Sequence, residues 1–108
     1  MQVHVSRALQ LQLQAPEDFK SFKLVIDLPK TARSDIAAAL APAGRIENEG
    51  TAWISEAWLR GASSLGSDEA WQAGVSGMIA YARKFGWVDD ATASIRAHIE
   101  WAGDRASP

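Results

Sequence analysis

Hydrophobic and polar residues alternate over the first part of the chain, and this period of two is typical of strands with one buried face. Over residues 3–13 the odd positions are mostly apolar and the even positions are mostly polar. Arg7 interrupts the apolar row, which indicates a bulge or a strand end. A second alternating run spans residues 22–28 and stops before Pro29. Because residues 15–18 have the composition of a turn, the two runs predict an antiparallel hairpin.

A short helix is predicted after the second run. Thr31 is suited to cap its N-terminus, and the helix extends to about Ala41. Ile36 and Leu40 lie four residues apart, which places them on one inner face. Proline and glycine at positions 42 and 44 then end the helix.

A second hairpin and another short helix follow. The segments 45–47 and 51–54 flank the turn residues 48–50, Asn-Glu-Gly, which predicts a hairpin. Residues 55–64 fit either a helix or a continued strand. Ser55 followed by an acidic residue is a helix start signal, so we predict the helix.

The clearest helical pattern begins after residues 67–69, Ser-Asp-Glu, which supply a cap and two anions. Gly86 is expected to end the helix in the left-handed conformation, with Trp87 folding back on the last turn. Gly74 and Gly77 lie inside the helix, where each costs about 1 kcal/mol relative to alanine, so close packing should offset that cost. The apolar stripe consists of Trp71, Val75, Met78, Ile79 and Ala82.

A final alternating run over residues 93–101 predicts the last strand, and the polar tail 102–108 is expected to fray. The resulting order is strand-strand-helix-strand-strand-helix-helix-strand. It predicts a single α+β domain over residues 1–101 with about five strands in an antiparallel or mixed sheet and two to three helices on one face.

Composition and charge narrow the possible functions. Lysine and arginine number 11 against 13 acidic residues, a net charge of −2, and there is no basic block, so we expect neither a nucleic-acid nor a membrane partner. The absence of cysteine excludes disulfides, thiol catalysis and thiolate metal sites. No secretory signal pattern and no long apolar run occur, so a cytoplasmic location is expected, and no cofactor is predicted.

The most suggestive polar set is the row Arg96, His98 and Glu100 in the last strand. Alternate residues of a strand project from one face roughly 6.6 Å apart. Arginine can clamp an anion, and a glutamate can orient a histidine as a base. The competing interpretation, which we favour, is the solvated face of a half-buried strand, so no catalytic residue is assigned.

The two histidines suggest a weaker alternative, a metal site. If the first and last strands were neighbours, His4 and His98 would approach each other and, with Glu100, offer two nitrogens and one oxygen to zinc. No closely spaced ligand motif supports this arrangement, so no metal is predicted.

The chain contains five tryptophans, which is many for its length, and each could lie in the core or on a binding surface. Patterning assigns Trp71, Trp87 and Trp101 to the core. Trp53 and Trp58 are less constrained by the pattern and are the better candidates for a pocket wall or partner surface.

The first strand, with glutamines at positions 10, 12 and 14 and no proline, would be open to pairing if it lay at a sheet edge. We therefore expect a small non-catalytic interaction or binding module, which pairs through that edge with a second copy or with another protein. The alternative is a small enzyme or ligand-binding protein built on Arg96, His98 and Glu100.

Overall fold

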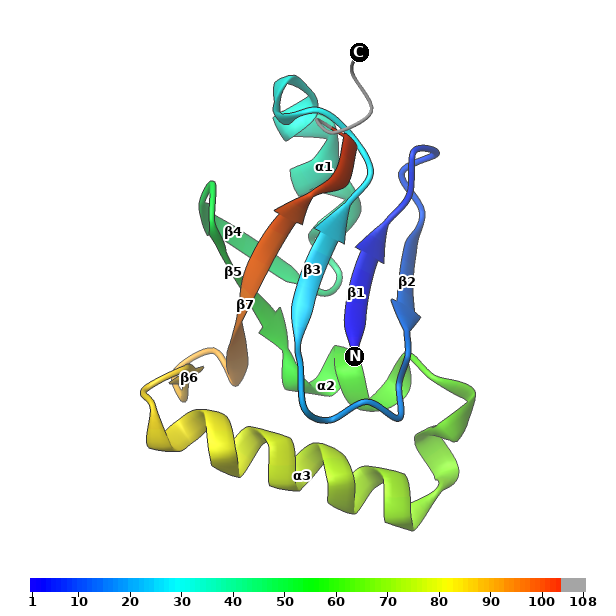
Figure 1. Cartoon of the computed structure of the whole chain (residues 1–108), viewed down its shortest axis with the longest axis vertical. Helices are drawn as coiled ribbons and strands as arrows, with labels where there is room; N and C mark the ends of the chain where they lie inside the picture. Colours follow the sequence, from blue (N-terminus) through cyan, green and yellow to red (C-terminus); the bar gives the residue numbers. More distant parts are fainter. Residues whose placement is uncertain (104–108) are drawn as a thin grey trace.

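The computed structural model describes residues 1–103, which form a mixed β-sheet with three α-helices (Figure 1). The strands are β1 (Gln2–Val5), β2 (Leu11–Gln14), β3 (Lys23–Ile26), β4 (Gly44–Asn48), β5 (Thr51–Ser55), β6 (Val88–Asp89) and β7 (Ser94–Trp101). The helices are α1 (Arg33–Leu40), α2 (Glu56–Gly61) and α3 (Glu69–Lys84), with 3-10 turns at Lys30–Ala32 and Ser64–Ser67. Residues 104–108 of the expected tail lie outside the described part.

The strands follow the order β2-β1-β3-β7-β5-β4, and the short β6 pairs with β7. Neighbours β1, β3 and β7 are parallel, whereas β2, β5 and β4 each run antiparallel to the neighbour they join. The predicted single α+β domain with a mixed sheet is therefore confirmed. The number of strands is slightly higher than expected, because the first predicted strand is divided and β6 was not foreseen.

The single strand predicted over residues 3–13 is wrong, because the chain reverses there into the β1–β2 hairpin. Ser6 begins the turn, and its Oγ accepts a hydrogen bond from the Gln10 N–H at 3.1 Å. Leu9 takes a positive φ of 63°. The hairpin register pairs Val5 with Leu11, odd position with odd position. Alternation therefore continues in phase across the turn, and the pattern alone does not distinguish one strand from two.

The predicted hairpin between the first and second runs is also wrong. Instead, β3 lies beside β1 in parallel, with β2 on the opposite side of β1. The loop 15–22 therefore crosses the end of β1 and packs against α3. The Trp71 indole N–H donates to the Pro16 carbonyl at 2.7 Å, and the Phe19 ring occupies the space beside Gly74. This contact explains Gly74 in the helix, whereas Gly77 has open space around it.

The two short helices form as predicted, although one cap differs. α1 buries Ile36 and Leu40 completely, but it begins at Arg33 and has no side-chain cap, because Thr31 lies in the preceding 3-10 turn. α2 begins after Ser55, whose Oγ accepts a hydrogen bond from the Trp58 N–H at 3.2 Å. That bond satisfies one free N–H of the first turn.

The long helix α3 buries all five residues of its predicted apolar stripe. Its N-cap is Asp68, and its C-terminus closes with a left-handed Gly86 at φ 74°. The Trp87 N–H donates to the Ala82 carbonyl and the Gly86 N–H to the Arg83 carbonyl, both at 3.1 Å, as in a Schellman motif. The backbone of Trp87 thus behaves as predicted, but its side chain does not enter the core and is 38% exposed.

The sheet has one covered and one open face. α1 lies behind the sheet in Figure 1, and α3 runs across the lower ends of the strands. The covered face carries the aliphatic core, which includes Val3, Val5, Leu24, Ile26, Ile54, Ile95 and Ile99. Within residues 1–103, no helix has the length and apolar character needed to span a membrane.

Candidate functional site

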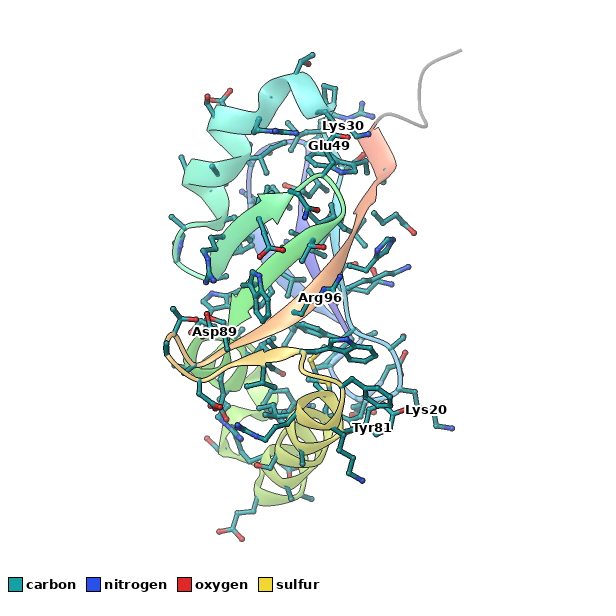
Figure 2. The ribbon with its side chains drawn as sticks, turned by 90° about the vertical axis from the view of Figure 1, so that its left-hand side faces the viewer. Lys20, Lys30, Glu49, Tyr81, Asp89 and Arg96 are labelled. Carbon is teal, nitrogen blue, oxygen red and sulfur yellow. The ribbon has the colours of Figure 1, made fainter. Side chains whose placement is uncertain are left out.

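The open face of the sheet carries the polar row that the sequence singles out. Arg96 and His98 of β7 are exposed on it, and Glu100 is half-buried. Lys23 of β3 forms an ion pair with Glu100, with 3.3 Å between Nζ and Oε1. In Figure 2 this face points to the right, away from α1, and Arg96 lies on it above Tyr81. The row thus faces solvent instead of lying beneath helices.

Arginines and tryptophans alternate in one row across this face. Arg45 of β4 pairs with Trp53 of β5, and Trp53 pairs with Arg96 of β7. On the other side of β7, the Arg96 N–H donates to the Trp87 carbonyl at 2.8 Å, so these two residues are also opposite each other. Directly opposed residues of antiparallel strands project from the same face. The order across the sheet is therefore Arg45, Trp53, Arg96, Trp87.

The two arginines in this row have different surroundings. Arg45 lies over the Trp53 ring, 5.7 Å from its centroid, and forms a 3.3 Å ion pair with Asp89. Hydrogen bonds from the Thr92 side chain and the Ala91 N–H, together with Arg45, lower the pKa of Asp89. The Arg96 guanidinium has no acidic or hydrogen-bonding partner in the described part of the chain.

A hollow of about 320 Å³ opens beside Arg96. Its residues come from β5, β7 and the segments that precede β3, β5 and β6. Phe22 and Trp87 provide apolar walls, and no carboxylate of residues 1–103 lines it. The lining consists of Phe22, Gly50, Thr51, Trp87, Arg96 and His98.

An exposed aromatic cluster borders the hollow. Tyr81 of α3 and Phe85, the C-cap residue directly after that helix, are 59% and 52% exposed. The Phe85 ring stacks on Trp87 with centroids 4.7 Å apart and an interplanar angle of 21°. Tyr81 adjoins Phe85 at 5.1 Å and contributes to a second shallow hollow with Phe19. Large aromatics gathered on a surface mark sites of interaction more often than scattered ones do.

The predicted site residues separate into two groups. Arg96 and His98 meet at the hollow, and Trp53 lies next to Arg96 with its indole N–H donating to Glu47 at 3.3 Å. Trp58 instead packs against the core from α2 and does not join the site. Trp87 was missed, because the residue after a helix-ending glycine is commonly apolar and buried. Its pairing with Arg96 depends on strand order, which the sequence pattern does not encode.

The condition for a histidine metal site is not met. His4 of β1 and His98 of β7 are separated by β3, which pairs with both strands. Among residues 1–103 there is no group of three histidine, cysteine, aspartate or glutamate side chains arranged to hold a metal. The buried Nδ1 of His4 has no hydrogen-bond partner in the same region.

The two edges of the sheet differ in their protection. At one edge, β4 carries the charged residues Arg45 and Glu47 and a register irregularity between Ile46 and Asn48. Charges and bulges discourage edge pairing. At the other edge, β2 reads Leu-Gln-Leu-Gln, with no charge and no irregularity. No element lies beyond β2 in Figure 1.

Searches against protein families, curated proteins and solved structures found no match for this chain, so its function is inferred from its own residues.

Proposed function

We propose that this protein is a small non-catalytic interaction module that associates with a second copy of itself through the edge strand β2. The observation that supports this proposal is an uncharged edge whose outward-facing backbone groups have no partner within residues 1–103. Homodimerisation is a property of this edge alone, because the opposite edge is charged and irregular.

The free backbone groups of β2 follow from the pairing of β1. The Asp27 N–H donates to the Val5 carbonyl at 2.9 Å, so odd residues of β1 direct their backbone groups toward β3. Even residues of β1 therefore bond to β2, and the register pairs even positions with even positions. The N–H and carbonyl groups of Leu11 and Leu13 point outward. None of them has a hydrogen-bond partner within residues 1–103.

Two copies of β2 satisfy these groups in one antiparallel register. With the two-fold axis at Gln12, Leu11 of one copy faces Leu13 of the other, and each leucine donates and accepts one backbone hydrogen bond. The leucines then share the covered side of a continuous sheet, where both are half-buried in the monomer. Shifting the axis by one residue in either direction leaves some of these groups unpaired.

The interface is small. A strand of four residues per copy buries less than the roughly 1,200 Å² of a standard interface, so we expect a weak, concentration-dependent dimer. A homodimer of this kind joins the two sheets side by side and leaves both open faces exposed.

The absence of native cysteine provides a direct test of this register. At the axis, the Gln12 residues of the two copies form a non-hydrogen-bonded pair with Cα atoms about 4.5 Å apart, which is within disulfide range. Gln12→Cys is expected to form a disulfide-linked dimer under mild oxidation. The matched control Gln14→Cys is equally exposed, but the same position in the partner copy lies about 14 Å away along the strand, so this variant should form no disulfide-linked dimer.

A second test introduces like charges at the axis: Gln12→Lys places two lysines opposite each other. In sedimentation equilibrium the wild type should show a concentration-dependent dimer and this variant should remain a monomer. Equal cross-linking of both cysteine variants, or a wild type that stays monomeric at every concentration, would overturn the proposal. Capture of another protein's strand by a monomeric wild type would instead indicate a hetero-partner.

An enzyme or ligand-binding protein built on Arg96, His98 and Glu100 is the alternative function. The exposure of Arg96 and His98 and the ion pair of Glu100 with Lys23 favour binding over catalysis. A cytoplasmic location stays a prediction from the sequence.

A further inference from the structure

We infer that the hollow beside Arg96 is a binding site for a small, flat organic anion such as an aromatic carboxylate. The site is independent of the proposed dimer, because β1 and β3 separate β7 from the edge strand β2. The inference combines the size of the hollow, the charge at its wall and the aromatic surface beside it.

The size fits a small ligand. A volume of about 320 Å³ lies at the lower end of the range of roughly 300–1,000 Å³ for small-molecule pockets. The hollow is open on one side and therefore covers only part of its ligand. We expect weak binding to a compact molecule of one or two rings.

The charge specifies an anion. Arg96 and His98 line the hollow, and no carboxylate does. Arg45, in the same row, is already paired with Asp89, whereas Arg96 has no such partner in residues 1–103. An arginine guanidinium matches a carboxylate with two parallel hydrogen bonds. Thr51 lines the same hollow and adds a hydroxyl that can donate to a second oxygen.

The apolar walls specify a flat ring. Trp87 and Phe22 line the hollow, and Phe85 stacks against the Trp87 ring at 4.7 Å. Two hydrogen bonds fix the Trp87 backbone. Its N–H donates to the Ala82 carbonyl, and its carbonyl accepts from the Arg96 N–H. A platform that is already ordered loses little entropy when a ring stacks on it.

The probe for this site is phenylacetate, with the neutral isostere phenylacetamide as its matched control. In ¹H–¹⁵N NMR titrations phenylacetate should shift the Trp87 indole and the Arg96 and His98 backbone signals in a saturable way. Phenylacetamide should bind at least about tenfold more weakly, because a charged hydrogen-bonded pair is lost.

The residue test compares Arg96→Gln with Arg7→Gln. Both variants remove one positive charge from an exposed position, but only Arg96 lines the hollow. Phenylacetate affinity should fall about tenfold or more in Arg96→Gln and stay unchanged in Arg7→Gln. Should Arg96→Gln fail to fold, the comparison of the acid with the amide on the wild type decides the question alone.

Three results would overturn the inference: no saturable shifts at the hollow, equal affinity for the acid and the amide, or equal affinity of the two arginine variants. The monomeric variant Gln12→Lys should bind phenylacetate like the wild type. Failure of the dimer and failure of the ligand site are therefore distinguishable.

Discussion

The two faces of the sheet have different roles, since one carries the hydrophobic core and the other carries the candidate site. On the covered face, aliphatic residues such as Leu24, Ile26 and Ile54 are fully buried, and α1 and α2 pack beside them. On the open face, Arg96 and His98 project into solvent beside a hollow, next to an exposed aromatic cluster. Strand β7 contributes to both faces, with Ile95 and Ile99 at odd positions in the core and Arg96 and His98 at even positions on the open face.

This difference predicts which face of the sheet tolerates amino-acid substitution. Stability depends on the covered face, because burial of aliphatic side chains is the main favourable term in folding. The open face contributes little to that term and is therefore free to carry charges and rings that suit a ligand. If this division is correct, substitutions at neighbouring residues of one strand should change the free energy of unfolding by very different amounts.

The largest expected effect comes from Ile99→Ala. Ile99 is 4% exposed on the covered face, and truncating it should lower the free energy of unfolding by about 2–5 kcal/mol. Its neighbour His98 is exposed, and His98→Ala should change stability by less than about 0.5 kcal/mol. Urea denaturation followed by circular dichroism measures both. Similar losses for the two variants would show that the open face is also structural.

Sequence patterning predicted most of the local elements of this fold. Helical spacing identified the stripe of α3, and alternation identified β7 with its correct faces. It did not predict strand order, because the energy that places β3 beside β1 comes from contacts between distant segments. The bond from Trp71 to Pro16 is one such contact. The chain reversal at Ser6 was not predicted for a different reason, because apolar residues continue at odd positions across the turn.

The candidate site was predicted only in part. Alternation placed Arg96 and His98 on one exposed face, because both belong to a single strand. Trp87 and Phe22 joined them only through tertiary structure, and no local pattern links those positions to β7. Trp87 was also assigned to the core, although it is 38% exposed and its ring stacks on the exposed Phe85.

A smaller effect on stability is expected at two glycines of α3, because Gly74 is packed against a ring and Gly77 has open space around it. Gly77 has nothing near the position of a Cβ atom, so Gly77→Ala should raise the free energy of unfolding by about 1 kcal/mol. Gly74→Ala gains the same helix propensity but overlaps the Phe19 ring, so we expect a net loss of up to about 2 kcal/mol. Thermal denaturation of the pair compares them directly. Equal stabilisation would mean that Phe19 contributes no packing at Gly74.

The smallest effect concerns the difference between Arg45 and Arg96. Hydrogen bonds from Thr92 and Ala91 and the charge of Arg45 lower the pKa of Asp89 in the folded protein. A lowered pKa stabilises the fold at pH values above the ordinary aspartate pKa of about 3.9 and loses that stabilisation as the pH falls through the folded value.

Asp89→Asn should therefore be less stable than the wild type at neutral pH, and the difference should shrink as the solution is acidified below about pH 4. Denaturant titrations across this range measure it. Arg96 has no carboxylate of this kind among residues 1–103, so Arg96→Gln should show no comparable pH-dependent loss. A difference for Asp89→Asn that persists unchanged into acid would mean that its carboxylate charge does not stabilise this end of the open face. The contrast between Arg45, which is neutralised by Asp89, and Arg96, which is available to a ligand, would then be unsupported.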